Sequence, residues 1–351
     1  MTRHIQIGGR RIGAGEPVYV IAEMSANHDH DLEQALKIVK AAKEAGADAI
    51  KLQTYTPDTI TLKSDRECFR ISGGTLWDGR TLHDLYAEAY MPWDWQPRLA
   101  AEAKQLGMDC FSSAFDATAV DFLEKMNVPA HKVASFELVD LPLIEKMART
   151  GKPLIMSTGM ATLEEVEEAV KTARSAGATQ IALLKCTSAY PSPPEEMNLR
   201  TIPDLGQRFD VPVGLSDHTT GITVAVAAVA MGACLLEKHI TLSRSSAGPD
   251  SAFSLEPAEF AAMVAGVRIA ERAVGSVHYG LSGEDSKSRA FRRSLFVSEE
   301  VKAGEAFTEK NVRSVRPGNG LHTRHLREVL GRTATRDIAR GTPLAWDMVA
   351  R

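Results

Sequence analysis

The sequence predicts an α/β fold, a (β/α)8 TIM barrel followed by a small β-rich domain, and three observations lead to this prediction. Eight short apolar segments alternate with helix-like segments between about residues 18 and 275, a length typical of this barrel. Each apolar segment ends in polar or charged residues, which cost folding energy unless they are satisfied or used. Beyond about residue 280 the pattern changes to short strand-like runs separated by turns.

The eight expected strands are recognised by their polar carboxyl ends, which meet on the catalytic face of such a barrel. In chain order these ends are Ile21–Glu23, Ile50–Gln53, Cys110–Ser113, Lys132–Ser135, Ile155–Thr158, Leu184–Thr187, Leu215–His218 and Leu236–His239. Glycines such as Gly46 and Gly177 mark the ends of the helices that precede the next strand. Thr162–Glu165 fits a capping box at the start of another helix. A doubly wound sheet is the alternative, but it would not need eight similar units.

One connection is much longer than the others. After the second strand, Tyr55–Pro92 far exceeds the roughly 2–6 residues of a typical βα loop. A long loop on the catalytic face is often a lid or a specificity element. The alternative is an insertion that packs on the barrel without a functional role.

The carboxyl-terminal part of the chain predicts a second, smaller domain. We expect a barrel domain over residues 1–280, a polar linker over 281–290 and a mostly β domain over 291–351. Its strand-like runs are Ser294–Val297 and Arg332–Thr335. So small a core is marginal alone, and we therefore expect this domain to dock against a barrel.

Composition and charge limit the possible classes of function. The net charge is −4 and the isoelectric point is near 6.2, which argues against nucleic acid or an anionic membrane as a partner. No apolar run approaches the roughly 18 residues of a membrane span, and the amino terminus lacks the apolar core of a secretion signal. The four cysteines show no CxxC spacing. We expect free thiols and a cytoplasmic protein.

Two lysines at strand ends point to an anion. Lys51 and Lys132 stand in apolar contexts, where an ammonium is costly unless it meets a negative charge. Hydroxyl groups stand on neighbouring strand ends, among them Ser112, Ser113, Ser135, Ser157 and Thr187. This set suits a phosphate or a phosphate ester. Two alternatives remain open: a Schiff-base lysine, or structural pairing with Glu23 or Glu137.

Two histidines follow the seventh and eighth strands, which are neighbours in a closed barrel. His218 and His239, accompanied by Asp217 and Glu237, could hold a divalent first-row metal with open coordination positions. Such a metal could polarise a carbonyl group. General acid–base catalysis is the alternative for these imidazoles.

Three further residues carry weaker signals. Asp250 follows the eighth strand and could orient water or substrate, although Pro-Asp is also common in turns. Tyr190 could line the rim of the pocket or simply pack in its loop. Arg316, in Arg316–Gly320, alone indicates no more than a turn with an exposed arginine.

Together these segments resemble the sialic acid synthase family. The matching stretches are Ile21–Glu23 with Asn27–His28, Lys51–Gln53, Lys132–Ser135, Ser157–Met160, Cys186–Pro191, Gly214–Thr219, Glu237–His239 and Arg316–Gly320. The resemblance covers nearly the whole chain in order, and its specificity comes from the joint match. The tail resembles the antifreeze-like (SAF) domain of that family, with Arg292–Leu295 near its start.

Within the family, Gly74–Asp78, Leu85–Tyr86 and Thr187–Tyr190 resemble the pseudaminic acid branch. Where the sialic acid branch usually has Asn, this chain has Ser188. The resemblance implies condensation of phosphoenolpyruvate (PEP) with 2,4-diacetamido-2,4,6-trideoxy-L-altrose and water, releasing phosphate by C–O cleavage. N-acetylneuraminate or legionaminate synthesis by the same mechanism is the alternative, and a Schiff-base aldolase is a remoter one.

The resemblance also implies roles for individual residues. PEP is held by Lys51, Ser113, Lys132, Ser135 and Ser157. His218 and His239 ligate Mn²⁺, or Mg²⁺ or Co²⁺, which orients the sugar aldehyde. Glu23 and Glu137 transfer protons or position water, and Tyr190 and Asp250 line the sugar side. Arg316 reaches from the tail domain into the barrel of a second subunit, which implies a domain-swapped homodimer.

Overall fold

The computed structural model describes residues 4–74, 77–246, 248–281 and 283–351. By their contacts the described residues form two compact units, which divide between Gly275 and Ser276. Thr75 and Leu76, part of the stretch that resembles the pseudaminic acid branch, lie outside the described residues, as does Ser282 of the expected linker.

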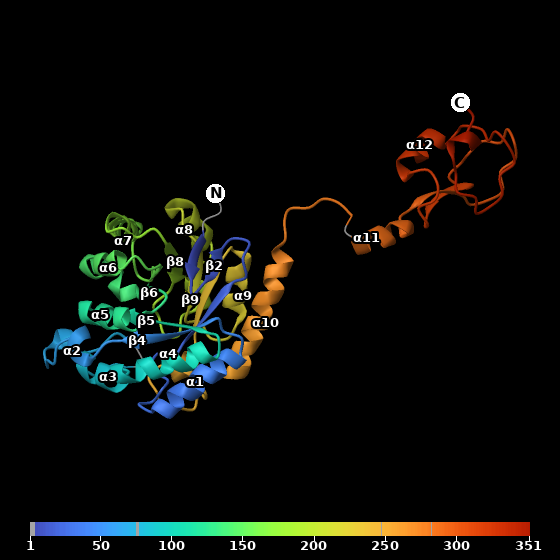
Figure 1. Ribbon diagram of the computed structural model, residues 1–351. Coiled ribbons are helices and arrows are strands. Elements are labelled where there is room, and N and C mark those ends of the chain that lie inside the picture. Colours follow the sequence, from blue (N-terminus) through green and yellow to red (C-terminus); the bar gives the residue numbers. More distant parts are fainter. Residues whose placement is uncertain (1–3, 75–76, 247, 282) are drawn as a thin grey trace. The chain divides into compact units, whose positions relative to one another are not determined.

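The first unit is the predicted barrel. Among the described residues, eight parallel strands close on themselves, with β10 paired to both β9 and β3. The strands are β3 (Tyr19–Glu23), β4 (Ala49–Thr54), β5 (Asp109–Ala114), β6 (His131–Val133), β7 (Leu154–Ser157), β8 (Ile181–Cys186), β9 (Val213–Asp217) and β10 (Leu235–His239). Most of their residues are buried, as expected for parallel strands covered on the outside by helices (Figure 1).

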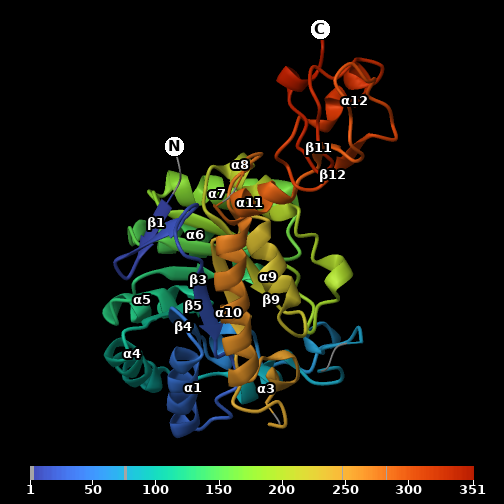
Figure 2. The ribbon, with the colours of Figure 1, turned by 90° about the vertical axis from the view of Figure 1, so that its right-hand side faces the viewer.

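Helices surround the barrel of strands and pack against its outer face. They are α1 (Leu32–Glu44), α4 (Gln96–Gln105), α5 (Ala117–Lys125), α6 (Leu141–Arg149), α7 (Leu163–Ser175), α8 (Thr201–Phe209), α9 (Thr223–Ala230) and α10 (Pro257–Val274). α10 packs against both α9 and α1, across the point where the barrel closes (Figure 2). The predicted capping box at Thr162 is present at the start of α7.

An amino-terminal hairpin, which the sequence did not predict, precedes the barrel. It consists of β1 (His4–Ile7) and β2 (Arg10–Gly13). The backbone N–H of Gln6 donates to Oε1 of Gln180, just before β8, at 2.7 Å, and Gly8 lies against Asp109 at the start of β5. The hairpin therefore covers the amino-terminal end of the barrel, opposite the strand ends that carry the predicted site.

The long connection after β4 is a folded segment. It contains α2 (Pro57–Ile60), η1 (Glu67–Phe69) and α3 (Leu82–Ala89), and η2 (Trp93–Trp95) leads into α4. Thr56 caps α2, and Thr81 caps α3 by accepting from Asp84 N–H. Shorter 3₁₀ turns, η3 (Ser135–Val139), η4 (Pro194–Glu196) and η5 (Ser251–Phe253), follow β6, β8 and β10.

The second unit is small and built mainly from turns and short strands. The expected linker region contains α11 (Gly283–Ser288) and η6 (Arg289–Phe291). β11 (Ser294–Val297) pairs with β12 (Val312–Val315), and η7 (Thr323–His325), α12 (Leu326–Val329) and η8 (Trp346–Met348) follow. The predicted run Arg332–Thr335 contributes only isolated bridges, through Thr333 and Ala334. In the part of the chain that the structure describes, no helix combines the length and apolarity needed to cross a lipid bilayer.

Candidate active site

A cavity of about 510 Å³ opens at the carboxyl ends of the barrel strands. Side chains alternate across a strand, so Lys51 and Gln53 of β4 face the cavity while Leu52 and Thr54 face the helices. The predicted barrel residues that line it are Glu23, Lys51, Ser113, Lys132, Ser135, Glu137, Ser157, Tyr190, His218, His239 and Asp250. Arg316 belongs to the other unit, where it is exposed directly after β12.

Lys51 is paired with carboxylates. Its Nζ lies 2.5 Å from Glu23 Oε2 and 3.5 Å from Glu237 Oε1, and all three side chains are almost completely buried. Burial alone lowers the pKa of Lys51, but the two carboxylates raise it above its ordinary value. Burial raises the pKa of Glu23 although Lys51 opposes the shift. Of the alternatives left open for Lys51, pairing with Glu23 is therefore present in the structure.

Lys132 is a buried cation of a different kind. Its side chain is 1% exposed, and no carboxylate of the described residues lies within ion-pair distance of its Nζ. The Nζ donates instead to Ser157 Oγ at 2.7 Å and to the carbonyl of Val133 at 2.9 Å. Burial lowers the pKa of this amine. The charge of Glu237 opposes this shift from beyond ion-pair distance, and an anionic ligand would offset more of the cost of burying the ammonium.

Hydroxyl groups surround the two lysines. Ser113 Oγ accepts from Lys51 at 3.1 Å, and Ser135 Oγ accepts from Gly159 N–H at 3.2 Å. Ser112, in contrast, faces outward and hydrogen-bonds Thr54 at 2.6 Å. The serines that face the cavity can donate to an anion, whereas Ser112 supports the packing of the barrel wall.

The two histidines lie side by side. The ring centroids of His218 and His239 are 5.3 Å apart. His218 Nδ1 lies 2.9 Å from the carbonyl of Thr187, which requires a ring N–H there and leaves Nε2 as an acceptor. Burial and the neighbouring cations lower the pKa of His239 well below its ordinary value. Burial also lowers the pKa of His218, but its contacts with Cys186 and Thr187 raise it above the ordinary value. His239 therefore presents a neutral nitrogen, whereas His218 does so once its ring has lost the second proton.

The donor set fits a divalent metal held by two imidazoles. Among the described residues, His239 Nδ1 is buried without a hydrogen-bond partner, with Asp250 Oδ2 at 3.9 Å. Among the described residues, no group of three or more His, Cys, Asp or Glu side chains is arranged so that it could hold a metal ion. Two protein nitrogens thus leave several positions open for substrate or water.

Two cavity residues were missed or misread from the sequence. Gln53 donates to Glu23 Oε1 at 3.1 Å and to Ser25 Oγ at 2.9 Å, and so orients the carboxylate of Glu23. Strand alternation from Lys51 could have identified it. Cys186 was interpreted only as a buried thiol, but its Sγ lies 3.7 Å from His218 Nδ1. Burial raises the pKa of this thiol, yet hydrogen bonding to His218 and other neighbours lowers it to about 7.

The side of the cavity formed by Tyr190 and Asp250 is aromatic and acidic. The Tyr190 ring lies 4.4 Å from the His218 ring, between centroids, and packs on Phe253. Asp250 is not merely a turn residue, because its carboxylate accepts from Ser25 Oγ inside the cavity. Burial raises the pKa of Asp250.

Glu137, on η3, has a perturbed acidity. Burial raises the pKa of its carboxyl from 4.5 to about 7, although Lys132 and Lys51 act in the opposite direction and Asp140 adds to the increase. The unfolded chain therefore gives up this proton at lower pH than the folded chain. The protonated form favours folding, and its contribution is lost as pH rises through about 7.

We expect Glu137→Gln to abolish this pH-dependent loss. As pH rises from about 4 to about 8, wild-type protein should lose up to about 3 kcal/mol of unfolding free energy relative to the variant. Urea unfolding at a series of pH values measures the difference. Glu145→Gln, on α6, is the matched control and should keep the wild-type profile. Parallel curves for wild type and Glu137→Gln would contradict the assignment.

A second buried ion pair lies on the outer side of the barrel wall. Lys238 Nζ is 2.8 Å from Asp217 Oδ2, both side chains are 1% exposed, and the same ammonium donates to the carbonyl of Thr219. Asp217 Oδ1 also accepts from Thr219 N–H at 2.9 Å. These contacts hold the loop that begins with His218, but the pair itself does not line the cavity.

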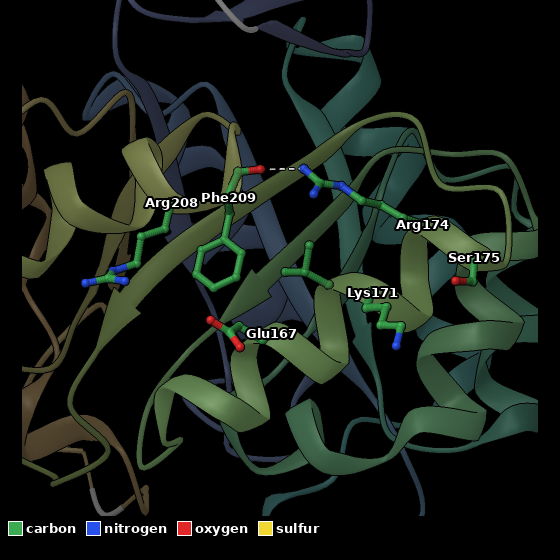
Figure 3. A pocket seen from close by; sticks show the side chains of 7 residues that line it. Glu167, Lys171, Arg174, Ser175, Arg208 and Phe209 are labelled. Carbon is green, nitrogen blue, oxygen red and sulfur yellow. Dashed lines mark hydrogen bonds between the residues drawn. The ribbon is translucent and has the colours of Figure 1, made fainter.

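Another hollow, of about 440 Å³, lies on the outside of the barrel between α7 and α8 (Figure 3). It is lined by Glu167, Lys171 and Arg208, and Arg174 donates to the carbonyl of Phe209. Arg208 is already bonded to Asp204 at 2.7 Å. Arg174 thus joins the two helices and Arg208 is paired within α8, so the catalytic candidates remain those at the strand ends.

The closed barrel, with buried lysines, hydroxyls, carboxylates and imidazoles on its catalytic face, defines a TIM-barrel enzyme that acts on an anionic substrate. The profile of the NeuB family matches residues 38–279, and that of the SAF domain matches residues 292–350. The chain therefore belongs to the NeuB family, as the sequence predicted, and it ends in a SAF domain.

Relatives match along almost the whole chain. A pseudaminic acid synthase of Campylobacter jejuni (strain 81-176) is 47% identical over 340 residues, covering 97% of this chain and 98% of the relative. That of Helicobacter pylori is 44% identical over 337 residues, covering 96% and 99%. The crystal structure of the spore coat polysaccharide biosynthesis protein SpsE of Bacillus subtilis superimposes with a TM-score of 0.68 at 34% identity, covering 99% of each chain.

Proposed function

We propose that this protein is a pseudaminic acid synthase, which condenses PEP with 2,4-diacetamido-2,4,6-trideoxy-L-altrose and water to give pseudaminic acid and phosphate. The observation that carries the proposal is the cation Lys132, which is buried at the strand ends beside hydroxyl groups and has no carboxylate of the described residues within ion-pair distance. PEP supplies both a carboxylate and a phosphate, the kind of ligand that such a pocket stabilises.

The reaction needs four events that the cavity residues can support. C3 of PEP forms a bond to the aldehyde carbon of the sugar, and water adds to C2. The bond between C2 and the bridging oxygen of the phosphate ester then breaks, so that phosphate leaves and a 2-keto acid remains. The aldehyde oxygen gains one proton, and the water, whose oxygen becomes the keto oxygen, loses both of its protons, the second one to the departing phosphate. Glu23 and Glu137, both in the cavity with pKa values raised by burial, are the proposed proton carriers.

The binding roles follow from position in the cavity. Lys51, Lys132, Ser113, Ser135 and Ser157 hold PEP. His218 and His239 would hold a divalent ion, with Mn²⁺ proposed and Mg²⁺ or Co²⁺ possible alternatives, and a bound ion would polarise the aldehyde. Tyr190 and Asp250 contact the sugar. Any Schiff-base role for Lys132 is disfavoured by membership of a PEP-dependent family.

The choice of sugar rests on the relatives and on the cavity wall. Pseudaminic acid synthases of two organisms share 47% and 44% identity with this chain over nearly its full length. The folded segment after β4 lines the cavity, which supports a role for it in sugar selection. Ser188 stands where the sialic acid branch usually has Asn. Its Oγ lies 3.8 Å from Cys186 Sγ, which is at the cavity.

Phosphate release from PEP tests this function. Purified protein with Mn²⁺ is given the altrose-derived sugar, the legionaminic acid precursor or N-acetylmannosamine in parallel. We expect release with the altrose-derived sugar. Release only with another sugar would keep the mechanism and change the assigned product, whereas no release with any of them from folded, metal-loaded protein would overturn the function.

We also propose that the active enzyme is a domain-swapped homodimer in the cytoplasm. The barrel domain (1–280) would receive Arg316 from the SAF domain (291–351) of the second subunit, with 281–290 as the linker. Phe136, which lines the cavity, is 58% exposed, so a second subunit that covered the cavity would bury apolar area there. The four cysteines are free, which agrees with a reducing compartment.

Subunit mixing tests the shared site. Arg316→Ala and Lys132→Ala should each be inactive alone, because each lacks a proposed substrate contact. After subunit exchange, mixed dimers should regain up to about half of the activity per site, since one of the two sites then contains both residues. Native mass spectrometry verifies the exchange. A verified heterodimer without activity would count against a site completed by the second subunit.

A further inference from the structure

The active-site cavity has two chemically different sides. Its floor carries the lysines, carboxylates and serines of the strand ends. The side formed by the segment after β4 is apolar: the residues there include Ile60, Ile71, Trp77, Leu82 and Leu85. We call these five side chains the apolar wall. The described residues of the strands that line the cavity are mainly polar or charged, so the wall is a distinct part of the cavity.

Backbone hydrogen bonds hold the apolar wall in place. Ile71 N–H donates to the carbonyl of Arg80, and Gly79 N–H donates to the carbonyl of Ile71, both at 2.9 Å. Arg70 and Thr81 form an antiparallel bridge beside these bonds, and Thr81 then caps α3, which carries Leu82 and Leu85. The wall therefore presents a surface whose shape is set before substrate binds.

The wall faces the sugar side of the cavity. The Trp77 ring lies 6.0 Å from the Tyr190 ring, between centroids, and Tyr190 packs on His218. The anion site, with Lys132 bonded to Ser157, belongs to the strands. A substrate that joins PEP on the strand ends would thus extend its far end toward the wall.

We propose that the apolar wall determines sugar specificity by binding the methyl groups of a 6-deoxy, di-N-acetylated sugar. This proposal rests on the proposed function and deepens it. The altrose-derived sugar carries a methyl group at C6 and two acetamido methyls. N-acetylmannosamine carries one acetamido group, and hydroxyls replace the other groups. Burying a methyl group against Ile and Leu is favourable, whereas a hydroxyl buried there loses its hydrogen bonds to water.

A matched pair of double variants tests the wall. Ile60→Thr/Ile71→Thr places two hydroxyls on it, and Ile60→Val/Ile71→Val has nearly the same shape without them. With the altrose-derived sugar, the Thr pair should reduce kcat/KM roughly 10- to 200-fold relative to the Val pair. The KM for PEP should stay within about threefold of wild type in both pairs, since the strand-end site is unchanged.

The outcomes separate this proposal from the function on which it rests. No product from wild type with the altrose-derived sugar would overturn the function and the wall together. Turnover by wild type, with equal kcat/KM for the Thr and Val pairs, would overturn the wall alone. The proposal for the wall would also be overturned if kcat/KM for the sugar fell in the Thr pair and the KM for PEP rose by the same factor. That result would indicate a general distortion of the site. Urea unfolding of both pairs confirms that they are folded.

Discussion

Lys132→Met should reduce kcat/KM for PEP by at least about 100-fold and should leave the protein as stable as wild type or more stable. The ammonium is buried and has no carboxylate within ion-pair distance among the described residues. Each charge-assisted hydrogen bond to an anion contributes about 1.5–3 kcal/mol, and methionine provides neither charge nor donor. Burial outweighs the attraction of Glu237 at this ammonium, so removing the charge relieves a cost to folding. Steady-state kinetics and urea unfolding measure the two effects.

Lys185→Met is the matched control for this change. Lys185 also stands at a strand end, on β8, but its Nζ donates to the carbonyl of Cys186 at 2.6 Å and to Thr187 Oγ1 at 3.2 Å. It lines a surface hollow instead of the active-site cavity. The kcat/KM of Lys185→Met for PEP should stay within about threefold of the wild-type value. If Lys132→Met bound PEP as tightly as wild type, the anion site would have to lie elsewhere.

His218→Ala should abolish turnover and weaken Mn²⁺ binding by at least about 100-fold while PEP still binds. Losing a residue that only orients a ligand typically costs 10–100-fold in metal affinity, and the loss of a ligand should cost at least as much. The proposed PEP contacts lie on other strands, with Lys132 on β6 and Ser157 on β7. Calorimetric titrations with Mn²⁺ and with PEP measure metal binding and PEP binding separately.

The control for His218 is another buried histidine. His131, on β6, faces outward and its Nε2 lies 2.9 Å from Glu124 Oε1. His131→Gln should retain Mn²⁺ affinity and turnover. Full, Mn²⁺-dependent phosphate release by His218→Ala would eliminate the proposed metal role, and turnover by wild type that is insensitive to EDTA would do the same.

The barrel could be predicted because its pattern repeats. Each strand is a buried run with a polar end, and closure brings those ends together, so Lys51 and His239 were expected at one site before any contact was known. Which lysine is paired could not be predicted. The register of β3 against β4 places Glu23 beside Lys51, whereas Lys132 stands farther round the barrel on β6. Such pairing depends on neighbours distant in sequence.

Short and irregular elements escaped prediction for a different reason. β1 and β2 have four residues each, too few for a periodic signal. Arg332–Thr335 has the composition of a strand but forms only isolated bridges. The segment between Tyr55 and Pro92 could be recognised as unusual by its length. That its apolar residues line the cavity could not be inferred, because this depends on how α2 and α3 fold back over the strands.

The buried pair of Lys238 and Asp217 has a consequence for how the barrel assembles correctly. Their Cα atoms are partners in the ladder between β10 and β9. A slip of one residue would turn Lys238 into the cavity and His239 out of it, because side chains alternate along a strand. It would also leave Asp217 buried without its cation, at a cost of about 3–5 kcal/mol. The pair thus penalises misaligned barrels, and fidelity of alignment is a stronger reason for its presence than added stability.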